Sequence, residues 1–315
     1  MADRELTPLV SINIPCYHQL EHARRCLQSI LGQTLQDFEV ILLDDGASDE
    51  YRAWAARLGD ARVSYVRNPE RLGAIRNMFQ AITAGSGRYT IAFHEDDRLG
   101  SRYLEAAVGI LEADPGCGFV GAEIQPFEHD PAQSELDRLI PASSIERYRD
   151  AEAFVRALMR GVNPMFGSIV YRRAAVETIV PAHEEYTTLV DRPFLLDVLA
   201  SWSSAIVREA VVWYRAHGEA DRRHDAMAPE HILRLFARYR AALPRYLTER
   251  DRRLFYDFSG YWLFTLHRLV PAPAQWPLRR FALRAWRDGL YHPRWSRGVA
   301  RKRLLAEMVA GRRHR

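Results

Sequence analysis

Apolar residues in the first part of the chain alternate between short continuous runs and longer stretches with helical spacing. The longer stretches, such as HARRCLQSILGQ and GAIRNMFQAITAG (73–85), predict amphipathic helices that end at a glycine. Short runs rich in apolar and β-branched residues predict strands at residues 9–15, 38–43, 61–66, 88–94 and 117–124, and the runs at 9–15 and 38–43 are typical of buried strands. Strands that alternate with helices predict an α/β fold, with a mostly parallel sheet covered by helices.

The last part of the chain has another pattern, in which apolar residues and arginines mix at helical spacing. Residues 231–315 contain 20 Lys and Arg against 5 Asp and Glu, whereas residues 1–230 contain 24 against 35. The boundary lies near MAPEH (227–231), and we predict a basic helical region over 229–315. It is either a helical subdomain packed on the rest, which we favour, or a surface that contacts anionic lipid. No nucleic-acid recognition module accompanies the charge, so we expect no nucleic-acid partner.

Composition narrows the class of protein further. Hydrophobic residues make up 48% and charged residues 27%, which is typical of a soluble globular enzyme and excludes disorder or coiled coil for most of the chain. The three cysteines are scattered, so we expect neither a disulfide framework nor a zinc knuckle. The start has no apolar signal segment and no stretch is long enough to span a membrane. We therefore expect a cytoplasmic protein, with contact at the inner face of the membrane as an alternative.

Carboxylates follow two of the predicted strands, at the sheet edge where ligands bind in such folds. Asp44-Asp45-Gly46 follows the second strand and His94-Glu95-Asp96-Asp97 the fourth, while Tyr17 follows the first. Clustered carboxylates repel one another unless a cation such as Mg²⁺ or Mn²⁺ lies between them. An aromatic ring can stack on a base, and there is neither a GxxxxGK[ST] phosphate loop nor a GxGxxG turn. These residues predict a nucleoside diphosphate bound with a metal.

Several ordered segments resemble glycosyltransferase family 2. VSINIPCYHQLEHARRCLQSILGQTLQDFEVILLDDGASD (10–49) resembles the opening of that family, and NPERLGAIRN (68–77) its second block. RYTIAFHEDDRL (88–99) is similar to the strand that ends in its DxD-type metal motif. Three later segments are also similar, namely FGSIVYRR (166–173), LVDRPFLLDVL (189–199) and VVWYRAH (211–217). The resemblance implies a GT-A fold over 1–228, with a donor half of about 1–125 and an acceptor half of about 126–228.

The resemblance also implies roles for individual residues. The metal would be held by Asp97, with His217 and Glu95 as weaker candidates. The resemblance leaves open whether Glu95 or Asp96 is the second carboxylate near the metal. Asp191 corresponds to the base that deprotonates the acceptor hydroxyl. The nucleotide-sugar would be bound by Pro15, Tyr17, Asp45, Arg76 and Asp96.

The expected function is inverting, metal-dependent transfer of a sugar from a nucleoside diphosphate to an acceptor hydroxyl. In such a transfer a base removes the acceptor proton while Mg²⁺ or Mn²⁺ offsets charge on the leaving diphosphate. The acceptor would be a saccharide, a lipid-linked saccharide or a small molecule, as in the synthesis of cell-envelope polysaccharide, glycolipid or natural-product glycosides. Two alternatives stay open: a sugar nucleotidyltransferase, and a catalytically degenerate scaffold that binds nucleotide-sugars.

Overall fold

The structure, a computed structural model, describes residues 7–46, 48–216 and 227–293. The described residues form two compact units. The first comprises the described parts of 1–150, 163–180 and 197–216, and the second those of 151–162, 181–196 and 217–315. This division differs from a single boundary at residue 228, because two short segments of the middle of the chain pack with the C-terminal helices.

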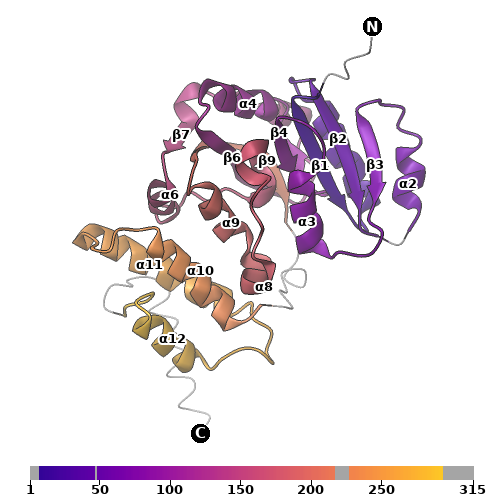
Figure 1. Ribbon diagram of the computed structural model, residues 1–315. Helices are drawn as coiled ribbons and strands as arrows, with labels where there is room; N and C mark the ends of the chain where they lie inside the picture. Colours follow the sequence, from indigo (N-terminus) through magenta and orange to yellow (C-terminus); the bar gives the residue numbers. More distant parts are fainter. Residues whose placement is uncertain (1–6, 47, 217–226, 294–315) are drawn as a thin grey trace. The chain divides into compact units, whose positions relative to one another are not determined.

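The first unit contains a nine-stranded sheet with the order β3-β2-β1-β4-β8-β6-β9-β5, and β7 also pairs with β9. Figure 1 shows β3, β2 and β1 side by side. The strands are β1 Val10–Cys16, β2 Phe38–Asp44, β3 Val63–Arg67, β4 Tyr89–Ala92, β5 Arg98–Leu99, β6 Cys117–Phe127, β7 Ile145–Tyr148, β8 Val170–Arg172 and β9 Ser203–Arg215.

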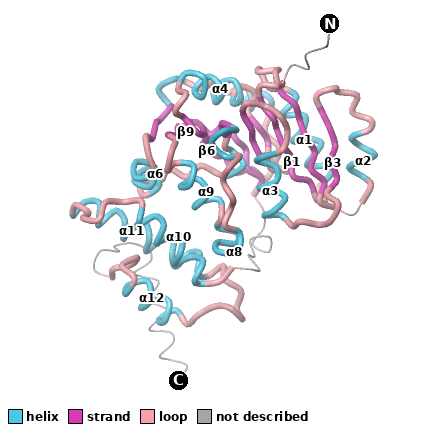
Figure 2. The backbone as a smooth tube through the Cα atoms, in the orientation of Figure 1, coloured by secondary structure: helices cyan, strands magenta, loops and turns pink. Residues whose placement is uncertain are grey.

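Helices cover this sheet, as Figure 2 shows in cyan against the magenta strands. α3 packs on β1 and β4, α4 on β6 and α2 on β3. The helices of this unit are α1 Leu20–Leu31, α2 Glu50–Ala55, α3 Ala74–Thr83, α4 Tyr103–Ala113, α5 Gln133–Leu136 and α7 Arg173–Val176, with short 3₁₀ turns at Ala142–Ser144 and Phe166–Ser168. The predicted α/β class with a covered, mostly parallel sheet is confirmed.

Four neighbouring strands of the sheet are all parallel, as β3, β2, β1 and β4 pair in that order. The edge strand β3 exposes Val66, whereas the apolar residues of β1, β2 and β4 are buried on both faces, with Ile12 and Ile14 of β1 and Val40 and Leu42 of β2 all fully inaccessible to solvent. Burial on both faces explains why these strands are continuous apolar runs. Parallel pairing also brings the carboxyl ends of β1, β2 and β4 to one edge of the sheet.

The strands on the other side of β4 depart from the parallel pattern. β8 is antiparallel to both β4 and β6, and β9 is parallel to β6 but antiparallel to β5 and β7. The run predicted to end at 124 continues to Phe127, because β6 follows β9 through register shifts up to Arg215. This long pair carries the last described residues of β9 to the loop that follows β4.

The second unit consists of helices. They are α6 Ala151–Leu158, α8 His183–Tyr186, a 3₁₀ turn at Thr187–Leu189, α9 Asp191–Val198 (whose last two residues belong to the first unit), α10 Pro229–Ala241, α11 Glu249–His267 and α12 Leu278–Arg287. Aromatic residues hold α10 to α11, with the Phe236 and Tyr239 rings both within 6 Å of the Phe258 ring. Within the described ranges, no helix is both long and apolar enough to cross a membrane.

Candidate active site

The loops after β1, β2 and β4 contact one another at the carboxyl edge of the sheet. The Asp45 amide donates a hydrogen bond of 2.9 Å to the Cys16 carbonyl, and the Tyr17 amide donates one of 3.0 Å to the Glu95 carboxylate. The loops approach so closely that a Cβ atom on Gly46 would lie 2.7 Å from the Tyr17 carbonyl oxygen. Glycine is therefore required in the Asp-Asp-Gly turn by this close backbone approach.

A group of three potential metal ligands lies in the turn after β4. Ligand atoms of His94, Asp96 and Asp97 all lie within 4.8 Å of one another. His94 Nδ1 is 3.2 Å from Asp97 Oδ2, and the Arg215 amide at the end of β9 donates a hydrogen bond of 2.9 Å to Asp97 Oδ1. The Asp97 side chain is fully buried, and burial raises its pKa while His94 opposes the rise.

The donor set fits Mn²⁺ or Mg²⁺. Carboxylate oxygens suit both ions, and a histidine nitrogen suits Mn²⁺ better than Mg²⁺. A bound cation would also stabilise the charged form of a carboxylate that burial alone disfavours, which is the situation of Asp97. The sequence pattern did not single out His94 as a candidate ligand, although its position three residues before Asp97 is a signal that could have indicated it.

Glu95 points to other partners than this group. Its two carboxylate oxygens accept hydrogen bonds from the Tyr17 amide and the Tyr51 hydroxyl. Burial raises the pKa of Glu95 to about 7 against these two hydrogen bonds, and the charges of Asp96 and Asp44 add to the rise. The weaker assignment of Glu95 as a metal ligand is therefore not supported by the geometry, which places Asp96 beside Asp97 instead.

Asp45 connects the end of β2 to the loop at 68–73. Its Oδ1 accepts from Asn68 Nδ2 at 2.9 Å and from the Leu72 amide at 2.7 Å, and its Oδ2 accepts from the Gly73 amide at 2.8 Å. A carboxylate has about four acceptor positions, so about one remains for a base N–H. Asp45 thus shapes the loop before α3 as well as facing the edge of the sheet, and its hydrogen bond with Asn68 has no signal in the sequence pattern.

The aromatic ring of Tyr17 is half-buried and is covered on one face. The Arg71 guanidinium lies over it at 4.6 Å from the ring centroid, a distance typical of a cation–π contact. A base that stacked on this face of Tyr17 would have to displace Arg71. Pro15 is also half-buried near the end of β1, and Arg76 is exposed on α3.

Three arginines surround Asp130 next to the metal-ligand turn. Arg98 lies 2.6 Å and Arg215 3.3 Å from Asp130 Oδ1, and Arg25 also pairs with this carboxylate. Burial opposes the change, but these arginines together lower the pKa of Asp130. Arg98 also donates to the carbonyl oxygens of Asp96 and Asp97, at 3.1 and 2.8 Å. The arginine cluster therefore fixes the backbone of the turn, and sequence spacing alone gives no signal for it.

Two of the predicted residues are not among the described residues of the first unit. Asp191 is the first residue of α9 and belongs to the second compact unit, where Arg192 Nε is 3.4 Å from its Oδ2. His217 lies outside the described residues. The structure thus brings Tyr17, Asp45, Asp96 and Asp97 to one edge of the first unit.

Comparison with protein families gives one matching model, described as glycosyl transferase family 2, over residues 11–180. An uncharacterised glycosyltransferase of Haemophilus influenzae is 24% identical over 226 residues, which cover 68% of this chain and 67% of that protein. A PGL/p-HBAD biosynthesis glycosyltransferase of Mycobacterium bovis is 28% identical over 59% of this chain and 68% of its own length. An uncharacterised protein of Mycobacterium tuberculosis is 36% identical, but the match spans only 36% of either chain.

Solved structures of glycosyltransferases have the same fold. S. aureus TarS 1–349 in complex with UDP superposes with a TM-score of 0.60 at 13% identity, covering 91% of this chain and 82% of that one. The mannosyltransferase PcManGT from Pyrobaculum calidifontis, in complex with GDP-Man and Mn²⁺, gives a TM-score of 0.54 at 18% identity, covering 97% and 87%. At such low identity these two structures support the GT-A fold alone.

Proposed function

The chain belongs to glycosyltransferase family 2, and we propose that it transfers a sugar from a nucleoside diphosphate to an acceptor hydroxyl with inversion at the anomeric carbon. The observation that carries the proposal is the group formed by His94, Asp96 and Asp97 at the carboxyl edge of the donor-side strands. That edge is where α/β sheets bind their ligands. Tyr17 and Asp45 extend from the same edge.

The residues of the turn after β4 would hold a divalent cation. His94, Asp96 and Asp97 are the proposed ligands, and Mg²⁺ or Mn²⁺ bound there would offset the charge that the diphosphate gains as it leaves. The Arg215 amide and the Arg98 guanidinium hold Asp97 and the turn in place before any ligand arrives. Such preorganised support around the ligands is what raises the affinity of metal sites.

The nucleotide would occupy the loops beside this turn. Tyr17 offers a ring face for the base, and the remaining acceptor position of Asp45 suits a ring N–H. Pro15 would line the base pocket, while Arg76 would face the ribose or diphosphate. Asp96 would contact the ribose as well as the metal. Relatives of this fold bind UDP, UDP-GlcNAc and GDP-Man, so uracil and guanine are the bases to test first.

The acceptor hydroxyl would be deprotonated by Asp191. Inversion requires a base on the face of the sugar opposite the leaving group, and Asp191 belongs to a different element from the metal ligands. The ion pair with Arg192 keeps the Asp191 side chain in a defined orientation. Displacement in a single step needs no nucleophilic serine or cysteine, and all three cysteines are buried.

The acceptor in this proposal is a saccharide, a lipid-linked saccharide or a small molecule. Two of the relatives are named for the biosynthesis of PGL/p-HBAD and of colanic acid, which are compatible with roles in the cell envelope. Contact with an anionic membrane through the basic C-terminal helices belongs to the same proposal. A lipid-linked acceptor would be encountered there.

The test is transfer and hydrolysis of UDP-, GDP- and dTDP-sugars, with Mn²⁺, with Mg²⁺ and with a chelator. We expect activity with at least one donor and its loss in the chelator. Asp191→Asn should keep donor binding but lower transfer by at least about 100-fold, because general-base catalysis contributes this much. Asp37→Asn is the matched control, since Asp37 is exposed at the other end of β2. Unchanged turnover in Asp191→Asn would overturn its role as the base.

The same assay separates the two alternatives. Release of pyrophosphate from a nucleoside triphosphate and a sugar phosphate would identify a sugar nucleotidyltransferase. Nucleotide-sugar binding without turnover on a broad acceptor panel would identify a degenerate scaffold. Either result would contradict the proposed transfer reaction.

A further inference from the structure

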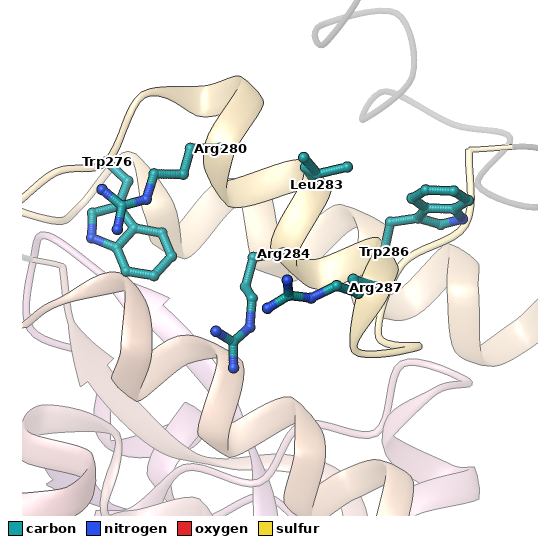
Figure 3. A pocket seen from close by; sticks show the side chains of 6 residues that line it. All are labelled: Trp276, Arg280, Leu283, Arg284, Trp286 and Arg287. Carbon is teal, nitrogen blue, oxygen red and sulfur yellow. The ribbon is translucent and has the colours of Figure 1, made fainter.

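One face of α12 exposes large apolar side chains to solvent. Leu283 is 61% and Trp286 51% exposed, and Figure 3 shows both on the same helix. The opposite face holds the helix in place, because Phe281 and Ala285 are fully buried. The Phe281 ring packs against the rings of His267 and Phe264 of α11, at 4.4 and 6.1 Å between centroids. The exposed apolar residues are therefore not needed for docking α12 on its own unit.

Arginines flank these two side chains. The helix LRRFALRAWR carries four arginines and no acidic residue. Arg280, Arg284 and Arg287 line a pocket together with Trp276, Leu283 and Trp286 (Figure 3). Asp288, directly after the helix, offsets part of this charge, with its carboxylate 2.6 Å from Arg284 and 4.0 Å from Arg287. We call this exposed set the α12 face: Arg279, Arg280, Leu283, Arg284, Trp286 and Arg287.

A groove of about 590 Å³ between α10 and α12 continues the α12 face. The groove adds Glu230 and Arg234 from α10, which leaves the balance of charge positive. At its edge the Arg280 guanidinium lies 4.4 Å over the Trp276 ring. Tryptophan and arginine beside each other are typical of surfaces that meet the headgroup region of a bilayer.

The positive charge of the α12 face limits which partners can bind there. The chain after residue 293 contains eight Arg and Lys but one Glu, so like charges disfavour that segment as a cover. A polyanion without an apolar phase would engage the arginines but would leave Leu283 and Trp286 in water. An anionic phospholipid surface satisfies both, because arginines meet the phosphates while the leucine and tryptophan enter the interface.

We propose that the α12 face docks the protein on an anionic phospholipid membrane. Leu283 and Trp286 enter the acyl boundary, and Arg280, Arg284 and Arg287 contact lipid phosphates. The biological purpose of this docking rests on the proposed function, because a glycosyltransferase held at the membrane would meet a lipid-linked acceptor directly. Its evidence is the surface of α12 alone, which is separate from the residues proposed for donor binding.

The experiment is co-sedimentation of the full chain with vesicles of phosphatidylcholine, and with vesicles of phosphatidylcholine and phosphatidylglycerol in equal amounts. We expect binding to the mixed vesicles only, weakening with salt. The double variant Leu283→Ser, Trp286→Ser should bind about tenfold or more weakly. Replacing Arg280, Arg284 and Arg287 by Gln should weaken binding by about a hundredfold, because each arginine near the surface contributes about fivefold.

The control variant is Leu139→Ser, an equally exposed leucine of the first unit at 69%. It should bind vesicles as the unchanged protein does. All variants should keep their circular dichroism and their affinity for nucleotide-sugar, so that a failure of glycosyl transfer and a failure of membrane docking are told apart. Equal binding to both kinds of vesicle would overturn the proposal. A serine double variant that binds mixed vesicles normally would also overturn it. The same holds if the unchanged protein binds single-stranded nucleic acid more tightly than mixed vesicles.

Discussion

The Glu95 carboxyl group is expected to make the metal-free protein less stable as the pH rises from about 5 to about 7. Its pKa rises from the ordinary 4.5 to about 7 in the folded protein, chiefly because the residue is buried, with only 8% of its surface exposed. Between these two values the folded state holds a proton that the unfolded state has lost. The stabilisation is complete below about 4.5 and disappears as the pH passes about 7.

The size of the effect follows from the same two values. The interval from 4.5 to about 7 corresponds to about 3 kcal/mol of unfolding free energy. Glu95→Gln removes the ionisable proton while an amide of the same shape can still bond to the Tyr17 amide or the Tyr51 hydroxyl. The variant should therefore lack this part of the pH dependence. Carboxyl groups with a lowered pKa, such as Asp130 and Asp251, lose their contribution at lower pH and do not obscure it.

The assay is urea-induced unfolding in the presence of a chelator at about pH 5, 6, 7 and 8. Unfolding is followed by tryptophan fluorescence and by circular dichroism. Both signals are needed because the chain has two compact units. Glu177→Gln, at an exposed glutamate at the end of α7, is the control for the loss of one carboxyl group. A Glu95→Gln protein whose stability depends on pH as strongly as that of the unchanged protein would refute the reasoning.

Three further outcomes are expected from the contacts of the site. Asp130→Asn should weaken Mn²⁺ binding by about tenfold, because it loosens the arginines that hold the turn; an affinity within about twofold would contradict that role. Gly167→Ala places a Cβ 3.2 Å from His94 Nδ1, so the imidazole must shift; Mn²⁺ affinity should fall about fivefold and the melting temperature by about 2–4 °C, and unchanged Mn²⁺ affinity would contradict the role of His94. Asp45→Asn leaves either the Leu72 or the Gly73 amide without its acceptor, so hydrogen exchange at these two amides should accelerate by about tenfold. Unaltered exchange would show that Asp45 does not hold the loop before α3.

The donor half of the fold is largely predictable because its strands carry their own signal. β1 and β2 are buried on both faces, so their residues are continuously apolar in the sequence. The antiparallel placement of β8 has no such signal, since it depends on pairing with β4 and β6, which are far away along the chain. The grouping of 151–162 and 181–196 with the C-terminal helices is a tertiary property of the same kind.

In the candidate site, too, the residues with a local sequence signal are predictable and the contacts between distant residues are not. Asp45 is recognisable because it directly follows the buried strand β2, and Asp96 and Asp97 because they lie in the short turn after the buried strand β4. The orientation of Glu95 is not, because its partner Tyr51 lies 44 residues earlier in the chain. Arg71 over Tyr17 is likewise a contact between loops, with no spacing in the sequence to indicate it.

The metal site is the central element of the account, and direct Mn²⁺ binding tests it best. The measurement is an electron paramagnetic resonance titration of free Mn²⁺ with the full chain, with and without UDP or GDP, comparing the unchanged protein with Asp97→Asn and the Asp37→Asn control. We expect Mn²⁺ to bind the unchanged and control proteins alike, more tightly with nucleotide, and at least about tenfold more weakly to Asp97→Asn. Equal Mn²⁺ affinity in the Asp97→Asn protein would contradict the assignment of the His94, Asp96 and Asp97 group as the metal site.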